Sequence, residues 1–165
     1  MSFLDSAADP KRAQKRALYF FLFATLGVGA GASLFTTPEI PTWYAGLNRP
    51  SIAPPNWVFA PVWTTLYLMM GFAAWLVWKI TGLRSAAMAA FALQLALNFA
   101  WSLIFFRLHD IGGALAEIVV LDLAILTTTI LFFGRDRLAG LLMLPYLAWT
   151  LFATFLTYAF WGLNR

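Results

Sequence analysis

The chain has no cysteine and only one histidine, His109, among its 165 residues. Without cysteine it can hold no disulfide framework, no thiolate metal site and no thiol nucleophile. One histidine cannot build a zinc site alone, because protein zinc sites need three or four ligands. The sequence therefore predicts no metal site and no obligatory cofactor.

Charged residues are scarce as well, at 11% of the chain, whereas 62% of its residues are hydrophobic. Soluble domains average roughly 25% charged and roughly 45 to 50% apolar residues, so this composition excludes an ordinary soluble domain. The net charge of +4 does not indicate nucleic-acid binding, because the charges lie at the ends of apolar runs rather than on one face. The charges indicate orientation in a lipid bilayer, and no nucleic-acid partner is expected.

Five apolar runs dominate the chain, and each is long enough to cross a bilayer as a helix. They cover residues 17–35, 57–78, 85–106, 111–133 and 138–160. None alternates polar and apolar residues as lipid-facing barrel strands do. The expected fold class is an all-α membrane protein, a single bundle of five transmembrane helices over residues 1–165.

The first run has an alternative interpretation as a signal peptide. Basic residues precede it, and Ala30-Gly31-Ala32 resembles a signal-peptidase site. The apolar run continues past this site to Phe35, so we interpret it as the first spanning helix.

Lysine and arginine are divided unequally between the two sides of this bundle. Arg49, Arg107 and Arg165 belong to one side, and the other eight basic residues belong to the side of the N-terminus. Connections on the cytoplasmic side of a membrane protein carry an excess of lysine and arginine. We therefore expect an integral, multi-pass protein whose N-terminus faces the cytoplasm-like side.

The connection at residues 36–56 is longer than the others and contains five of the eight prolines. Loops of this length in compact domains are usually functional or disordered. Trp43, Tyr44 and Ile52 favour an ordered loop that covers the bundle as a lid, and Arg49 belongs to the same segment. The alternative is an aromatic belt, in which Trp43 and Tyr44 merely lie at headgroup depth.

Several unusual residues lie at one depth below this loop. A rise of about 1.5 Å per helical residue places Trp63, Trp101, Glu117 and Ala153 about 8 to 10 Å from the loop side. Helical spacing aligns them with three stripes: Phe59, Trp63 and Tyr67; Gln94, Asn98 and Trp101; and Trp149, Ala153, Leu156 and Phe160. The sequence thus predicts a single pocket in the leaflet on the loop side.

Asn98 is informative because an amide in hydrocarbon must find hydrogen-bond partners. It either joins helices through interhelical hydrogen bonds or contributes to a ligand pocket, and the spacing of residues leaves both interpretations open.

Two carboxylates, Glu117 and Asp122, fall in the fourth run. Five residues apart, they point about 140° apart around a helix and cannot form a close catalytic pair. Acids within a membrane indicate a proton relay or a cation site, so a small transporter or exchanger that uses Glu117 and Asp122 is an alternative function. We expect Asp122, near the bilayer centre, to be protonated or to face a hydrated cavity.

No catalytic residue is predicted. The sequence has no glycine-rich phosphate loop, no serine–histidine–aspartate arrangement and no metalloprotease motif.

Small residues repeat at four-residue spacing in two runs. Gly27 and Gly31 form one row, and Ala92, Ala96 and Ala100 form the other. Such rows let helix backbones approach closely. We expect one row to pack within the chain and the other to form the face of a homodimer.

Three blocks of sequence resemble a known family. Residues 43–50 (WYAGLNRP) lead to residues 54–67 (PPNWVFAPVWTTLY), residues 98–101 (NFAW) precede Phe105-Phe106, and residues 145–149 (PYLAW) precede residues 152–154 (FAT). In this order on five runs, they are similar to the translocator protein family, also called tryptophan-rich sensory proteins or peripheral benzodiazepine receptors. The resemblance covers residues 27–164.

The resemblance implies a five-helix bundle, usually dimeric, whose pocket below the first loop binds porphyrins such as protoporphyrin and haem-like molecules. In animal members the ligands include cholesterol and benzodiazepine-site drugs. The family's pattern places Phe59, Ala60, Trp63, Asn98, Trp101, Trp149, Ala153 and Leu156 around that pocket. A porphyrin would then be a ligand rather than a cofactor, and Arg49 and Arg107 on the loop side are candidates to contact its propionates.

The chain departs from the family pattern at three positions. Ile52 stands where tryptophan is frequent, Thr157 stands where asparagine is frequent, and Gly162 replaces the basic residue of the cholesterol motif. Specific cholesterol recognition is therefore not expected. The resemblance implies a receptor or sensor, with degradation of bound porphyrin under light and oxygen as the enzymatic alternative.

Overall fold

The computed structural model describes residues 10–165, and the described part consists of helices and short connections, without strands. Its long helices are α1 (Pro10–Glu39), α2 (Phe59–Thr81), α3 (Ala86–Ser102), α4 (Ile111–Phe133) and α5 (Arg137–Asn164). Two 3-10 turns, η1 (Tyr44–Gly46) and η2 (Asn56–Val58), lie between α1 and α2, and a π-helical turn, η3 (Leu103–Arg107), continues α3. Five helices are long and apolar enough to cross a membrane, as predicted.

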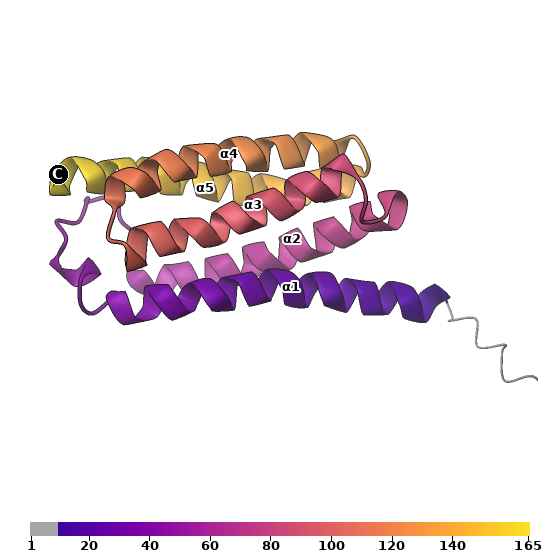
Figure 1. Cartoon of the computed structure of the whole chain (residues 1–165), viewed down its shortest axis with the longest axis horizontal. Helices are drawn as coiled ribbons and strands as arrows, with labels where there is room; N and C mark the ends of the chain where they lie inside the picture. The colour runs from indigo at the N-terminus through magenta and orange to yellow at the C-terminus, as the bar shows by residue number, and fades with distance from the viewer. Residues whose placement is uncertain (1–9) are drawn as a thin grey trace, which may run out of the picture.

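The five helices run side by side along the long axis of the molecule (Figure 1). Helix α1 packs against α2 and α3, α2 packs against α5, and α4 packs against both α3 and α5. The neighbour order around the bundle is therefore α1, α2, α5, α4 and α3. The connection between α1 and α2 lies at the same end as the C-terminus and the turn from α3 to α4 (Figure 1).

Side-chain caps explain where three of the helices begin. Ser85, Asp110 and Asp136 each accept a hydrogen bond from the backbone N–H three residues ahead, at the first turns of α3, α4 and α5. Such caps satisfy backbone donors that have no partner within the helix. Helix α2 ends before Gly82, which adopts a left-handed φ of 67°. Glycine accepts this conformation without steric cost.

Helices α1 and α5 extend past the apolar runs that predict them, whereas α4 coincides with its predicted run. Helix α1 begins at Pro10 and ends at Glu39, beyond both ends of the predicted segment 17–35. Helix α5 likewise continues from Phe160 to Asn164. Hydropathy marks the part of a helix that lies in hydrocarbon, and backbone hydrogen bonds continue into polar surroundings. The connection between α1 and α2 is correspondingly shorter than the predicted 36–56.

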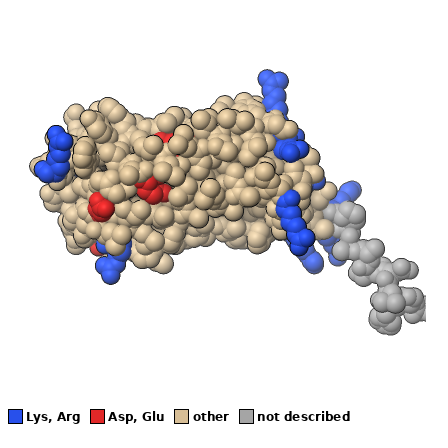
Figure 2. Space-filling model, turned by 45° about the horizontal axis from the view of Figure 1, so that its top comes forward, with Lys and Arg blue, Asp and Glu red and all other residues tan. Residues whose placement is uncertain are grey.

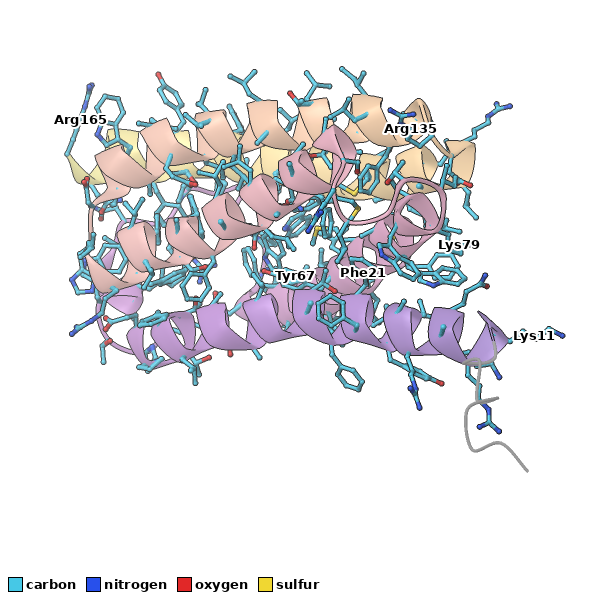
Figure 3. The ribbon with its side chains drawn as sticks, turned by 45° about the vertical axis from the view of Figure 1, so that its right-hand side comes forward. Lys11, Phe21, Tyr67, Lys79, Arg135 and Arg165 are labelled. Carbon is cyan, nitrogen blue, oxygen red and sulfur yellow. The ribbon has the colours of Figure 1, made fainter. Side chains whose placement is uncertain are left out.

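Basic side chains are segregated along the bundle. Figure 2 shows most Lys and Arg side chains at one end of the molecule and fewer at the other. In Figure 3, Lys11, Lys79 and Arg135 lie at the first end and Arg165 lies at the opposite end. This arrangement agrees with the predicted division of charge, and the cytoplasmic location of the N-terminus remains a prediction from it.

The rows of small residues have different surroundings. A side chain on Gly31 would approach the Phe99 ring of α3, so this glycine allows packing within the chain, whereas Gly27 has open space around it. Ala92 and Ala96 are exposed on α3. Their outward position is compatible with the predicted homodimer face, which remains a prediction.

The backbones of α1 and α2 approach each other closely at a glycine outside the predicted rows. A methyl group added to Gly71 of α2 would lie 2.8 Å from Thr25 Oγ1 and 2.9 Å from the Phe21 carbonyl oxygen of α1. The same Thr25 hydroxyl donates a hydrogen bond of 2.8 Å to the Tyr67 carbonyl oxygen. Gly71 therefore sets the spacing of α1 and α2, and Thr25 links them.

We predict that Gly71→Ala destabilises the protein by about 1 to 3 kcal/mol, because the added methyl group forces the two helices apart. Gly27→Ala is the matched control, since it adds the same group in open space and gains roughly 0.5 to 1 kcal/mol of helix propensity. Reversible unfolding of both variants in detergent measures the difference. Equal stability of the two variants would contradict this account of the helix contact.

Candidate functional site

A cavity of about 570 Å³ lies inside the bundle below the loop between α1 and α2. Its volume falls in the range of small-molecule sites, which span about 300 to 1,000 Å³. All five long helices contribute to its walls, and Tyr44 reaches it from the loop. The structure places all eight predicted pocket residues around it: Phe59, Ala60, Trp63, Asn98, Trp101, Trp149, Ala153 and Leu156.

A chain of buried hydrogen bonds joins three helices at the inner end of this cavity. The Tyr67 hydroxyl donates to Asn98 Oδ1 at 2.6 Å, and Asn98 Nδ2 donates to the Tyr146 hydroxyl at 3.1 Å. The Tyr146 hydroxyl in turn donates to Gln94 Oε1 at 2.9 Å. Tyr146 and Gln94 are fully buried, and Asn98 is 4% exposed. Asn98 therefore joins helices through hydrogen bonds and also lines the cavity, and its contact with a ligand stays a prediction.

Aromatic rings from α2, α3 and α5 form much of the cavity wall. Trp63 lies 5.6 Å from the Tyr67 ring, and Trp149 meets Phe59 edge-on at 5.9 Å. Trp101 stacks on Phe105 at 4.9 Å, so its ring is held in place from one side. Its buried indole Nε1 has no hydrogen-bond partner within residues 10–165. The cavity wall therefore consists mainly of apolar aromatic faces.

Aromatic contacts of Trp43 and Tyr44, two of the three predicted lid residues, order the loop over the cavity. Tyr44 is 7% exposed, lines the cavity and lies 5.4 Å from the Phe160 ring. Burial raises the pKa of the Tyr44 hydroxyl, and the nearby Arg49 guanidinium offsets part of the rise. Trp43 does not line the cavity and instead stacks on His109 at 4.3 Å, with the rings 12° from parallel.

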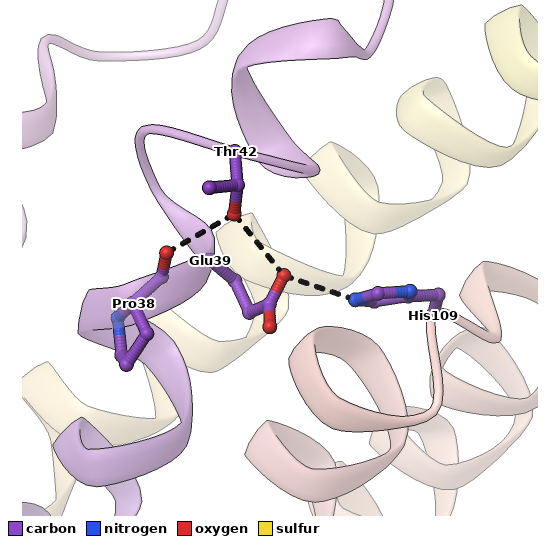
Figure 4. Close-up of polar contacts among 4 residues, drawn as sticks. All are labelled: Pro38, Glu39, Thr42 and His109. Carbon is purple, nitrogen blue, oxygen red and sulfur yellow. Dashed lines mark hydrogen bonds and ion pairs between the residues drawn. The ribbon is translucent and has the colours of Figure 1, made fainter.

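His109 connects this lid to the end of α1. Its Nε2 lies 3.1 Å from Glu39 Oε2, and the Thr42 hydroxyl donates both to the same oxygen and to the Pro38 carbonyl (Figure 4). His109 has a left-handed φ of 57°, which is uncommon for a residue other than glycine. The contact could not be read from the sequence, because His109 and Glu39 are 70 residues apart.

Arg49 and Arg107, the two arginines predicted to contact porphyrin propionates, do not line the cavity. Arg49 donates to the Pro54 carbonyl oxygen at 3.0 Å, and its guanidinium lies 5.5 Å from the centre of the Tyr44 ring. Arg107 is exposed at the end of η3. Contacts from these arginines to a ligand remain a prediction, and they would require movement of either the ligand or the side chains.

The two carboxylates of α4 lie outside the cavity wall as well. Asp122 Oδ2 accepts a hydrogen bond of 2.6 Å from the Thr154 hydroxyl and so links α4 to α5. Its Oδ1 and both carboxyl oxygens of Glu117 are buried without a hydrogen-bond partner in the described part of the chain. No group of three or more His, Cys, Asp or Glu residues suited to a metal occurs among residues 10–165.

Comparison with known proteins agrees with this architecture. The model of the TspO/MBR family matches residues 20–162. The tryptophan-rich protein TspO of Archaeoglobus fulgidus is 41% identical over 145 residues, which cover 87% of this chain and 94% of the relative. The human translocator protein is 43% identical over 153 residues, or 90% of each chain. The tryptophan-rich sensory protein of Cereibacter sphaeroides is 38% identical, covering 90% of this chain and 92% of its own.

We predict that Tyr146→Phe destabilises the bundle by about 1 to 3 kcal/mol, because it leaves buried amide groups of Asn98 and Gln94 without their partner. Tyr158→Phe, at an exposed position of α5, removes the same hydroxyl without this cost. Unfolding in detergent compares the two variants. A Tyr146→Phe protein as stable as Tyr158→Phe would show that the buried chain contributes little.

We also predict that His109→Asn loosens the lid. Asparagine tolerates the left-handed backbone, so the variant removes the stacking on Trp43 and the contact with Glu39 without adding strain. Amide hydrogen exchange of residues 43–47 should accelerate by about threefold to tenfold, as expected from the loss of roughly 1 kcal/mol. Leu108→Ala, at the exposed neighbouring position, is the control. Unchanged exchange in His109→Asn would refute this role.

Proposed function

The chain belongs to the TspO/MBR family, and from that premise we propose that it is a membrane receptor or sensor whose cavity binds porphyrins. Other flat hydrophobic molecules, including benzodiazepine-site drugs, would use the same cavity. The observation that carries the proposal is an apolar cavity with indole rings on three different helices, Trp63, Trp101 and Trp149, below an ordered loop.

The shape and chemistry of the cavity support a flat apolar ligand. Aromatic side chains prefer offset-stacked or edge-on contacts, each worth about 0.5 to 1.5 kcal/mol beyond the burial of area. Three indoles on separate helices would orient a ring system, while the apolar walls would supply most of the affinity. The Asn98 side chain, held by hydrogen bonds to Tyr67 and Tyr146, offers a polar contact at a fixed position in the wall.

The lid supports a role in admission of the ligand. Tyr44 lines the cavity, so a ligand that enters from the loop side has to displace the segment around it. The stacking of Trp43 on His109 and the contact between His109 and Glu39 hold that segment closed. Relatives named translocator protein and tryptophan-rich sensory protein suggest transport or sensing as the consequence of binding.

We predict saturable quenching of tryptophan fluorescence when protoporphyrin is titrated into the purified protein. Trp63→Phe and Trp149→Phe should each weaken binding about threefold to tenfold, because each removes part of one aromatic contact. A benzodiazepine-site drug should compete. The control is Trp78→Phe, in α2 on the far side of the buried hydrogen-bond chain and outside the cavity wall.

Binding that does not saturate, or that Trp78→Phe weakens as much as Trp63→Phe does, would contradict the proposal. Either result would mean that porphyrin partitions into the detergent micelle rather than into the cavity.

A further inference from the structure

A second hollow lies on the outer surface of the bundle at the loop end. It is a groove of about 600 Å³ between loop residues 49–52 and the last turns of α5. Ala159 and Gly162 contribute small residues to it, and a methyl group added to Gly162 would meet no atom within 4 Å. None of the residues that line this groove lines the main cavity.

The groove carries two positive charges and no acidic side chain. Arg49 and Arg165 both line it. The Arg49 guanidinium donates one hydrogen bond to Pro54, and the Arg165 guanidinium lies 5.2 Å from the centre of the Trp161 ring. A guanidinium has five N–H donors, so these contacts leave donors for a further acceptor. Arginine pairs well with phosphate because its planar donors match the phosphate oxygens.

Hydrogen bonds next to both arginines hold the two walls of the groove together. The Asn48 backbone N–H donates to Asn164 Oδ1 at 2.8 Å, and Asn164 Nδ2 donates to the Asn48 carbonyl oxygen at 3.1 Å. Arg49 and Arg165 directly follow these asparagines in the sequence. The loop and the end of α5 thus bring the arginines to one groove, although they are far apart along the chain.

An apolar surface continues from the arginines toward the middle of the membrane. Phe155 and Tyr158 line the groove with 59% and 57% of their surfaces exposed. Phe155 precedes Asn164 by nine residues, about 14 Å along the axis of α5. Figure 3 shows Arg165 at the end of the molecule, where headgroups would lie if the bundle spans a bilayer. The groove therefore combines a cationic outer part with an apolar inner part.

We propose that this groove binds an anionic phospholipid of the leaflet on the loop side. Arg49 and Arg165 hold the phosphate, and an acyl chain lies along Tyr158 and Phe155. The anionic lipid supplies the charge that complements the two arginines, and basic pockets on membrane proteins bind lipid headgroups in this way. Because the groove and the main cavity share no residues, this site does not rest on the proposed porphyrin binding.

Native mass spectrometry of the purified full-length protein with equal amounts of phosphatidylglycerol and phosphatidylcholine tests the proposal. We expect the wild type to retain phosphatidylglycerol about tenfold better, since each arginine near a membrane surface attracts anionic lipid by about 1 kcal/mol. Arg165→Gln, and more strongly Arg49→Gln with Arg165→Gln, should reduce this preference. Gly162→Leu should reduce retention while both charges remain, because its side chain fills the groove.

Arg107→Gln is the matched control, since it removes one charge at the same end of the molecule but outside the groove. Equal loss of preference in Arg107→Gln and Arg165→Gln would overturn the proposal, because general charge would then explain the binding. Unchanged retention in Gly162→Leu would overturn it too. Inorganic phosphate at the same concentration should not displace the lipid, and displacement would show that the site recognises phosphate without the acyl chain.

Discussion

The hydrogen-bonded chain from Tyr67 through Asn98 and Tyr146 to Gln94 crosses the centre of the bundle and connects α2, α3 and α5. Hydrocarbon offers no alternative partners for these groups, so the three helices must keep the register in which the groups meet. Apolar packing alone would not select one register, because lipid tails are as apolar as the side chains. The positions of the cavity walls on α2, α3 and α5 follow from that register.

The row of buried hydrogen bonds also separates two halves of the molecule that are packed differently. On the side of the N-terminus, the helices close tightly around fully buried side chains such as Met70, Phe132 and Met143. On the loop side, they enclose the cavity. The contact of Gly71 with α1 belongs to the closed half, where backbones approach closely. A rigid half therefore supports a hollow one, and the hollow half carries the tryptophans that a flat ligand would contact.

The loop between α1 and α2 joins these parts to the membrane surface. Tyr44 covers the cavity, Trp43 anchors the loop on His109, and Asn48 attaches it to the end of α5. The same loop supplies Arg49 to the outer groove. Movement of this single segment would therefore change both the access to the cavity and the shape of the groove. This loop alone would therefore suffice to couple ligand binding in the cavity to lipid binding in the groove.

The sequence by itself determined the helical membrane class, the five spans and the helix stripes that carry Trp63, Trp101 and Trp149, because hydropathy and helical periodicity are local properties of a chain. The family resemblance supplied Ala60 in addition. Only the tertiary structure decided which groups meet: the pairing of Asn98 with Tyr67 and Tyr146, the contact of His109 with Glu39, and the distance of Arg49 and Arg107 from the cavity. These outcomes depend on the relative rotation and register of helices distant in the sequence, which no local pattern encodes.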